Sequence, residues 1–314
     1  MSRFRPICQD FVSFMSPVWC RKMSSTSLPV FNSILYSVKN RVANIQLNRP
    51  ARMNAIDHHM PRELQTAVEL ANENMDVKVI VLSGSKVFCS GYDLKIFAEP
   101  KRGTVPGSQT MPWDPYIDYT FMSACTNAFM SIWRSYKPVV GKISGVAIGG
   151  GSDIALLCDI TVAAEDARIG YPPSRVWGCP TTAMWVYRVG LERAKRILLT
   201  GDLLTGKQAA DIGLIGEAVP ASQLDEAVDK VVQRLVTVPT NQMFFQKQVI
   251  NNAVEMMGLF SSQRLATFMD GMTRHTPEGV AFQKRAQEVG FKEAVRERDM
   301  GVDTTWSTPP KPKL

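Results

Sequence analysis

Two glycine-containing segments hold the residues whose types and spacing could do chemistry. The first, Gly149-Gly150-Gly151, leads into Ser152-Asp153 and an apolar stretch typical of a helix start. Backbone N–H groups at such a point have no partner within the helix, so they suit an anion or a developing oxyanion. The second segment is Phe88 to Asp93. If the N–H groups of Tyr92 and Gly150 converge on one carbonyl oxygen, they would stabilise an enolate or a tetrahedral oxyanion.

The strands predicted from hydrophobic periodicity place both segments at one edge of a sheet. Residues 42–47 alternate apolar and polar side chains, which indicates a half-exposed strand, whereas 77–82 is almost continuously apolar, as in a central strand. Further strands are predicted at 139–143 and 160–163. Both glycine segments follow a strand, and open α/β sheets bind ligands at that carboxyl edge. One glycine run alone indicates a tight turn more often than a site, but two together favour a site.

Helical periodicity separates the strands and then dominates the rest of the chain. One helix is predicted to begin with Pro61 in its first turn, and another covers 122–133 and ends before Pro138. From about residue 183 onward the pattern is helical, with Ser222 expected to cap one segment. The predicted fold class is therefore α/β, with a βαβ-rich first part and a helical C-terminal region.

The 314 residues have the composition of a soluble globular protein, with 45% hydrophobic and 21% charged residues. No apolar run is long enough for a membrane span, so none is expected. The six cysteines show no CxxC spacing and lie mostly in apolar segments, which favours reduced, packed thiols. No metal site is expected either, because His58, His59 and His275 lack spaced Cys, Asp or Glu partners.

Both ends of the chain have the composition of targeting segments. Residues 1–28 combine four basic residues with one acidic residue, as a mitochondrial presequence does, although a disordered tail would have the same composition. The final Pro312-Lys313-Leu314 imitates a peroxisomal Ser-Lys-Leu signal, with Pro in place of Ser. We expect a mitochondrial location, with a peroxisomal one as the alternative. The helix from Pro61 lacks a basic stripe, so no nucleic-acid partner is expected despite a net charge of +7.

Over about residues 31–295 the chain resembles the crotonase family, which comprises enoyl-CoA hydratases and isomerases. The matching segments are 47–50, 53–56, 88–95, 137–139, 145–151, 155–159, 167–170, 199–201, 209–215 and 219–220. The resemblance implies a crotonase-like spiral of ββα repeats with a helical C-terminal region. It also implies an acyl-CoA substrate, a role in fatty acid metabolism, and a homotrimer or hexamer. No cofactor is expected, because coenzyme A is part of the substrate.

The composition of the two ends and the resemblance together divide the chain into four parts. They are a cleavable leader at 1–28, a crotonase core at 29–225, a C-terminal helical oligomerisation region at 226–300 and a tail at 301–314. Residues 99–118 are expected to form a long irregular loop near the acyl pocket. The sequence of such a loop does not identify the acyl group that it contacts.

Residue by residue, the resemblance puts the oxyanion hole on the backbone N–H groups of Tyr92 and Gly150. The expected coenzyme A contacts are Arg52, Ala55, Asp93 and Lys95, with Phe282 and Lys284 or Arg285 completing them from a neighbouring subunit. Cations suit the phosphates, although Arg52 and Lys95 are equally explained as ordinary exposed charges. The candidates for the acyl pocket are Tyr171, Pro173 and Arg175, with Tyr92 and Thr181 or Thr182 as further polar groups. Arg175 would suit a carboxylated acyl group or a structural acid.

The catalytic carboxylates are where the chain departs from the family pattern. A family hydratase has Glu at the position of Asp153 and a second Glu at the position of Pro173, and the two activate water. Pro173 cannot transfer a proton, and the Asp153 carboxyl is one methylene nearer the backbone; a displacement of about 1 Å can cost roughly 100-fold. Asp153 is the candidate catalytic acid or base, with helix capping as its alternative role.

The leading functional prediction is hydration, dehydration or double-bond isomerisation of an acyl-CoA thioester through a stabilised enolate. The alternative is a non-catalytic acyl-CoA-binding homologue that kept the oxyanion hole and lost the chemistry at Pro173. RNA binding ranks last. The two-glutamate hydratase mechanism is not expected to apply unchanged.

Overall fold

The computed structural model of this chain describes residues 29–101, 103–104, 109–110 and 112–301. The predicted leader and the tail beyond residue 301 lie outside the described residues. Within them, no helix combines the length and apolar character needed to cross a membrane.

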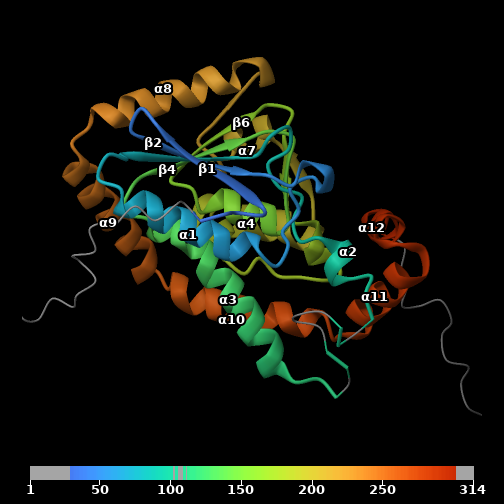
Figure 1. Ribbon diagram of the computed structural model, residues 1–314. Helices are drawn as coiled ribbons and strands as arrows, with labels where there is room; N and C mark the ends of the chain where they lie inside the picture. The colour runs from blue at the N-terminus through green and yellow to red at the C-terminus, as the bar shows by residue number, and fades with distance from the viewer. Residues whose placement is uncertain (1–28, 102, 105–108, 111, 302–314) are drawn as a thin grey trace, which may run out of the picture. The chain divides into compact units, whose positions relative to one another are not determined.

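A six-stranded sheet with the order β1-β2-β3-β4-β6-β9 forms the centre of the fold (Figure 1). Its strands are β1 (Ile34–Lys39), β2 (Val42–Leu47), β3 (Val79–Ser83), β4 (Val139–Ile143), β6 (Ile160–Ala164) and β9 (Glu217–Val219). Only β1 runs antiparallel to its neighbour, and all other pairs are parallel. The strands predicted at 42–47 and 139–143 are confirmed, and β3 is almost fully buried, as its continuous apolar run indicated.

A second, three-stranded sheet carries the glycine triplet. It consists of β5 (Val146–Ile148), β7 (Arg168–Gly170) and β8 (Leu203–Thr205), with β5 and β7 parallel and β8 antiparallel to β7. The chain leaves β5 directly into Gly149, which caps the short helix α4 (Gly150–Leu156). The expectation that this helix begins at Ser152-Asp153 is therefore wrong. Gly149 has a φ of 57° and a ψ of −126°, a conformation that glycine allows, so the helix begins two residues earlier.

The helices of the first part are α1 (Met60–Glu73), α2 (Leu94–Phe97) and α3 (Pro115–Arg134). Those that follow α4 are α5 (Met184–Val189), α6 (Leu191–Thr200), α7 (Gly206–Asp211), α8 (Leu224–Thr237), α9 (Thr240–Met256), α10 (Leu259–Thr273), α11 (Pro277–Val289) and α12 (Phe291–Asp299). Short 3-10 turns lie between some of the strands and the next helix: η2 (Pro50–Arg52), η3 (Pro172–Arg175) and η4 (Ala221–Gln223). Figure 1 shows α8 and α1 on opposite sides of the six-stranded sheet, and α3 beside α10.

The two helices predicted in the first part are confirmed. Helix α1 has Pro61 in its first turn and buries Leu64 and Val68 against the core. Helix α3 buries Phe129 and Trp133 and ends before Pro138. The mixed α/β fold with a helical C-terminal region is thus as predicted.

Three local expectations are wrong. The loop expected at 99–118 ends at Asp114, whose carboxylate accepts the Tyr116 N–H over 2.9 Å while Pro115 occupies the first helical position of α3. Ser222 does not cap α8, because it lies within the turn η4. The stretch after residue 183 is not purely helical, since it includes β8 and β9.

The cysteines of the described residues are free thiols, as expected. Cys89, Cys125 and Cys158 are buried and Cys179 is half-buried. Burial raises the pKa of the Cys89 and Cys158 thiols to about 12. These groups therefore stay protonated and serve as packing residues. The other two cysteines lie in the segment 1–28, outside the described residues.

Candidate active site

Backbone hydrogen bonds join the two glycine segments. Cys89 donates its N–H to the Val146 carbonyl over 2.9 Å, and Ile148 donates to the Cys89 carbonyl over 3.0 Å. Cys89 and Ala147 form an isolated parallel bridge. The chain after β3 therefore runs along β5 as a short extra strand, which brings the two segments together as the sequence predicts.

Asn54 ties a third loop to the same place. Its side chain is buried, donates to the Val87 carbonyl over 2.6 Å and accepts the Arg49 N–H over 2.8 Å. Asn54 has a φ of 53°, a left-handed conformation that Asn tolerates better than most residues. Ile56 then donates its N–H to the Gly91 carbonyl over 2.8 Å. The loop that carries Arg52 and Ala55 is thereby fixed against the Gly91 segment.

Glycine is required where these loops touch. Gly91 has a φ of +91°, and a Cβ there would lie 2.8 Å from the Ile148 carbonyl oxygen. A Cβ on Gly150 would lie 2.8 Å from Cδ1 of Ile56 and 3.0 Å from the Tyr92 ring. Such separations are shorter than van der Waals contact, so the loops approach this closely only without side chains. The backbone amides of Tyr92 and Gly150 are therefore neighbours.

The N–H groups of Tyr92 and Gly150 are the two donors predicted for an oxyanion hole. Both residues line one cavity, and within the described residues neither N–H donates to another protein group. Further along the same helical turn, the Ser152 N–H donates to the Gly149 carbonyl over 2.9 Å. Two unused donors on one cavity wall can bind a carbonyl oxygen and stabilise it as negative charge develops.

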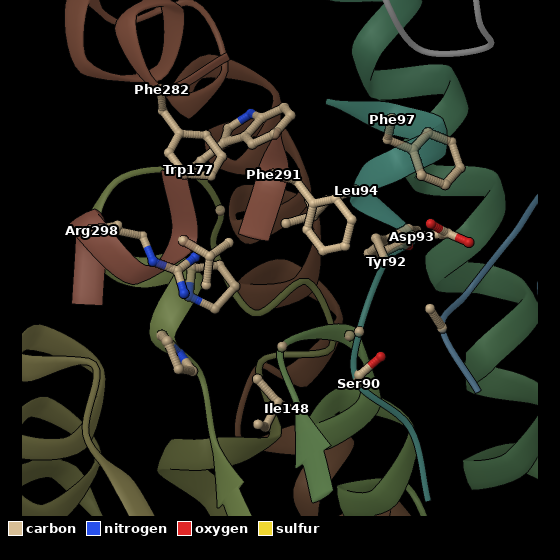
Figure 2. A pocket seen from close by; sticks show the side chains of 18 of the residues that line it. Ser90, Tyr92, Asp93, Leu94, Phe97, Ile148, Trp177, Phe282, Phe291 and Arg298 are labelled. Atoms are coloured by element: carbon tan, nitrogen blue, oxygen red, sulfur yellow. The ribbon is translucent and has the colours of Figure 1, made fainter. Parts of the chain in front are cut away.

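The cavity has a volume of about 660 Å³ and lies between the glycine segments and the C-terminal helices. Figure 2 shows Trp177 and Phe282 together at one part of its wall and Phe291 beside Leu94 and Tyr92 at another. The Trp177 and Phe282 rings pack with centroids 5.4 Å apart. Mostly apolar walls with a few convergent polar groups are typical of a small-molecule site.

A small second core holds α11 and α12 over this cavity. Its buried members are Ala98, Phe282, Ala286 and Ala294, so it joins the end of α2 to both C-terminal helices. Phe282 lines the cavity of its own chain, which corrects the expectation that it reaches the site from a neighbouring subunit. The physical reason is this cluster, which packs α11 against α2 of the same chain.

The cationic residues expected on α11 do not line the cavity of their own chain. Lys284 is exposed, and Arg285 forms an ion pair with Glu297 over 2.8 Å. Helix α12 supplies Lys292 and Arg298 to the cavity lining instead. Sequence reasoning missed these two residues because a helix of alternating charges resembles an ordinary exposed surface.

Three of the four residues expected to contact coenzyme A lie together at the cavity. Arg52, Ala55 and Asp93 line it, whereas Lys95 is exposed and outside the lining. Asp93 is almost fully buried and paired with Arg52 over 2.7 Å and with Arg49 over 3.1 Å. Burial alone would raise its pKa, but hydrogen bonds from these guanidinium groups outweigh burial and hold the pKa below its usual value. Asp93 therefore orients Arg52 at the cavity wall.

Asp153, the predicted acid or base, lies within α4 and is 2% exposed. Its carboxylate accepts a hydrogen bond from the Thr182 hydroxyl over 2.6 Å. Burial raises its pKa to about 7; the Thr182 hydrogen bond opposes this rise and the charge of Asp270 adds to it. A carboxyl that titrates near neutrality suits proton transfer. Asp153 is not among the cavity-lining residues, although its neighbour Gly150 is.

Only two of the three acyl-pocket candidates line the cavity. Tyr171 and Pro173 line the cavity, and the Tyr171 hydroxyl donates to the Cys179 carbonyl over 2.7 Å. Arg175 is exposed and donates to the Thr200 carbonyl over 2.8 Å, outside the cavity lining. Arg175 therefore contacts the C-terminal end of α6 and does not line the cavity in which an acyl group would bind.

The C-terminal end of α10 and the two residues after it supply polar side chains that sequence reasoning missed. Asp270, Arg274 and His275 all line the cavity. Arg274 pairs with Asp270 over 3.1 Å and with Asp118 of α3 over 3.2 Å, and His275 contacts Asp118 over 2.7 Å. The one signal available was the spacing of Asp270 and Arg274, four residues apart on a helix, which also occurs on ordinary surfaces.

Two polar atoms of the cavity wall are buried and make no hydrogen bond within the described residues. They are the Tyr92 hydroxyl and the Trp177 indole nitrogen. Burial raises the pKa of Tyr92 well above its usual value, so the hydroxyl stays protonated. Both atoms can therefore donate a hydrogen bond to a molecule bound in the cavity. Among the described residues, no cluster of three or more His, Cys, Asp or Glu side chains could hold a metal ion.

Comparison with known proteins agrees with this geometry. Residues 37–288 match the family model described as enoyl-CoA hydratase/isomerase. A probable mitochondrial enoyl-CoA hydratase of Dictyostelium discoideum is 29% identical over 226 residues, which cover 69% of this chain and 75% of that protein. The 2,3-dehydroadipyl-CoA hydratase of Escherichia coli is 27% identical, with 82% and 98% covered.

Solved structures show the same likeness. The crystal structure of an enoyl-CoA hydratase from Mycobacterium smegmatis is 44% identical in sequence to this chain. It superposes with a TM-score of 0.81 and covers 86% of this chain and 94% of that one.

Proposed function

Because the chain belongs to the enoyl-CoA hydratase/isomerase family, also called the crotonase family, we propose that its cavity binds an acyl-CoA thioester and activates it as an enolate. The chain is an enzyme of the hydratase/isomerase type that acts on acyl-CoA. In the proposal, the thioester carbonyl oxygen accepts hydrogen bonds from the N–H groups of Tyr92 and Gly150. These donors stabilise the charge that develops on oxygen when the carbon beside the carbonyl loses or gains a proton.

The observation that carries this proposal is the pair of unused backbone donors on one cavity wall. They meet because Gly91 and Gly150 let two loops touch. Asp153 is proposed as the group that moves the proton, since its carboxyl titrates near neutrality beside the glycine triplet. Together they support hydration, dehydration or double-bond isomerisation.

Mass spectrometry of products from a panel of 2-enoyl-, 3-enoyl- and 3-hydroxyacyl-CoA thioesters tests the proposal. Gain or loss of one water identifies a hydratase, and double-bond migration without a change of mass identifies an isomerase. The absence of turnover across the whole panel would contradict the catalytic proposal. If crotonyl-CoA then still raised the melting temperature, the non-catalytic alternative would replace it; the observations in its favour are Pro173 at the cavity wall and Asp153 outside the lining.

Arg52 is proposed to contact the phosphates of coenzyme A from its place beside Asp93. Its replacement by Ala is expected to raise KM for a coenzyme A thioester about tenfold, because one charge-assisted contact is worth about 1.4 kcal/mol. KM for the matching N-acetylcysteamine thioester, which lacks the nucleotide, should change less than about twofold. Steady-state kinetics on both thioesters measure this difference. Arg62→Ala, at an exposed position on α1, is the control; equal effects on both thioesters would place Arg52 elsewhere.

We infer that α9 and α10 form a subunit interface. Ten large apolar side chains on these helices and the turn between them are 37% to 80% exposed. They are Phe245, Val249, Ile250, Met256, Met257, Phe260, Leu265, Phe268, Met269 and Met272. Exposed apolar side chains gathered in this way often mark a subunit interface, and a closed homotrimer or hexamer would cover this α9–α10 apolar surface.

The double variant Ile250→Glu/Leu265→Glu is expected to break this assembly into monomers, because two charges would have to be buried at the interface. Light scattering coupled to size-exclusion chromatography measures the mass. The unmodified protein should have three or six times the chain mass of 34.9 kDa. Leu199→Glu, at an exposed apolar position on α6 outside this surface, should leave that mass unchanged. A monomeric unmodified protein would refute the interface.

The division of the chain stays part of this proposal. We propose a leader at 1–28, a core at 29–225, an oligomerisation region at 226–300 and a tail at 301–314. A mitochondrial location is supported by the composition of the leader and by the Dictyostelium relative, whose name states that location.

A further inference from the structure

A carboxylate from another part of the chain lies beside Pro173. Asp270 on α10 lines the cavity and is 6% exposed. Gly178 marks the place: a Cβ built there would lie 3.1 Å from Pro173 Cβ, 3.4 Å from the Tyr171 hydroxyl and 3.5 Å from Oδ1 of Asp270. The Asp270 carboxylate and the Pro173 ring therefore flank the same point of the cavity wall. Pro173 occupies the position at which the resemblance places the second hydratase Glu.

The protein holds this carboxylate in a fixed place. Oδ1 of Asp270 accepts the Cys179 N–H over 3.0 Å, and Oδ2 accepts from Nη1 of Arg274 over 3.1 Å. Nη2 of Arg274 is held in turn by Asp118 over 3.2 Å. An ionised carboxylate has about four lone-pair sites, so each oxygen can accept one more hydrogen bond. A water molecule in the cavity would donate its hydrogen bond to one of these oxygens.

Helix packing explains how Asp270 reaches this position. Gly271 follows it on α10, and a Cβ on Gly271 would lie 2.9 Å from Cβ of Asp118 on α3. Glycine here lets the two helices approach more closely than a larger residue would. The close approach turns the preceding residue into the cavity and sets the Arg274 guanidinium between two carboxylates.

We propose that Asp270 is the second carboxylate of the reaction and replaces the one that Pro173 removes, so that the enzyme adds water to a 2-enoyl-CoA. This inference rests on the proposed function. In the first step the water oxygen bonds to C3 of the enoyl group, Asp270 takes one water proton, and the C2=C3 electron pair moves to the thioester oxygen. The oxyanion hole holds the resulting enolate. The pair then returns to C2, which bonds a proton released by Asp153.

A proton passes from Asp270 to Asp153 through solvent to complete the cycle, so the net change is the addition of one water. The surroundings of Asp270 support its part. Burial raises its pKa, while Arg274 and the Cys179 N–H lower it and Asp118 raises it. A carboxyl with a raised pKa is a stronger base than an exposed one and still ionises beside the Arg274 cation.

Asp270→Asn tests the inference, with crotonyl-CoA as the probe. The hydration kcat is expected to fall about 30-fold with KM changed less than about threefold, because the amide cannot accept the water proton. Exchange of the C2 proton of butyryl-CoA in deuterated water should stay within about fivefold, since that step uses Asp153. Adding Pro173→Glu to the variant should recover at least about tenfold in kcat, because it restores a carboxylate at the family position.

Asp159→Asn is the control for stability, because Asp159 is an ion-paired acid away from the cavity, 2.7 Å from Lys247. It should lower the melting temperature without lowering kcat. Equal losses of hydration and C2 exchange in Asp270→Asn, or unchanged hydration, would overturn the role of Asp270 while the proposed function stands. No turnover by the unmodified enzyme would overturn both.

Discussion

Replacing Asp153 with Asn is expected to lower kcat about 300-fold while thioester binding stays within about twofold. The amide has the size of the carboxylate, and its oxygen can still accept the Thr182 hydroxyl, which now lies 2.6 Å from the carboxylate. What the variant loses is a group with a pKa of about 7 that can give and take a proton. Steady-state kinetics and calorimetric titration with a non-reacting acyl-CoA measure the two quantities. Turnover within about threefold of the unmodified enzyme would remove Asp153 from the mechanism.

Thr182→Val is the matched control for this prediction. The Thr182 hydroxyl lowers the pKa of Asp153 by stabilising its charged form, so its removal raises that pKa further above about 7. The limb of the pH–rate profile that Asp153 controls should therefore move to higher pH. The kcat at the optimum should change far less than it does in Asp153→Asn. An unchanged profile would show that the titration of Asp153 does not limit the rate.

The features that the sequence predicted correctly are local. Pro61 and Pro138 fix where a helix begins and where one must end, because proline lacks an N–H and restricts its own φ. The glycine segments predicted where two loops meet at the cavity, since Gly91 and Gly150 stand at positions where a Cβ would collide with another loop. The family resemblance then turned two predicted donors into a predicted oxyanion hole.

The features that the sequence did not predict depend on contacts between distant parts of the chain. Asp270 meets Cys179 from 91 residues away, and no local pattern distinguishes it from an ordinary helical Asp. Arg175 has the charge for an acyl carboxylate, but the fold gives it the Thr200 carbonyl instead. Phe282 lies at the cavity, but it comes from the same chain, because the small cluster with Ala98 packs α11 on its own chain.

Changing Gly91 to Ala should lower kcat about 1,000-fold, the largest effect of any single substitution considered for this enzyme. Two causes act together at this position. A φ of +91° strains any residue with a Cβ, and the new Cβ would lie 2.8 Å from the Ile148 carbonyl oxygen. That oxygen belongs to backbone that cannot move aside easily, so the peptide between Gly91 and Tyr92 must shift. The shift displaces the Tyr92 N–H from the oxyanion, and one lost donor costs about 10²- to 10³-fold.

Gly213→Ala separates the loss of the donor from backbone strain alone. Gly213 has a φ of +78°, and a Cβ there would meet nothing within 4 Å, so the control keeps the strain and omits the collision. Both variants should lower the melting temperature, but only Gly91→Ala should lose turnover, and kcat should fall more than KM rises because the donor acts mainly on the transition state. Equal kinetic losses in both would mean that stability limits activity. A fully active Gly91→Ala would mean that the Tyr92 amide does not face the developing charge.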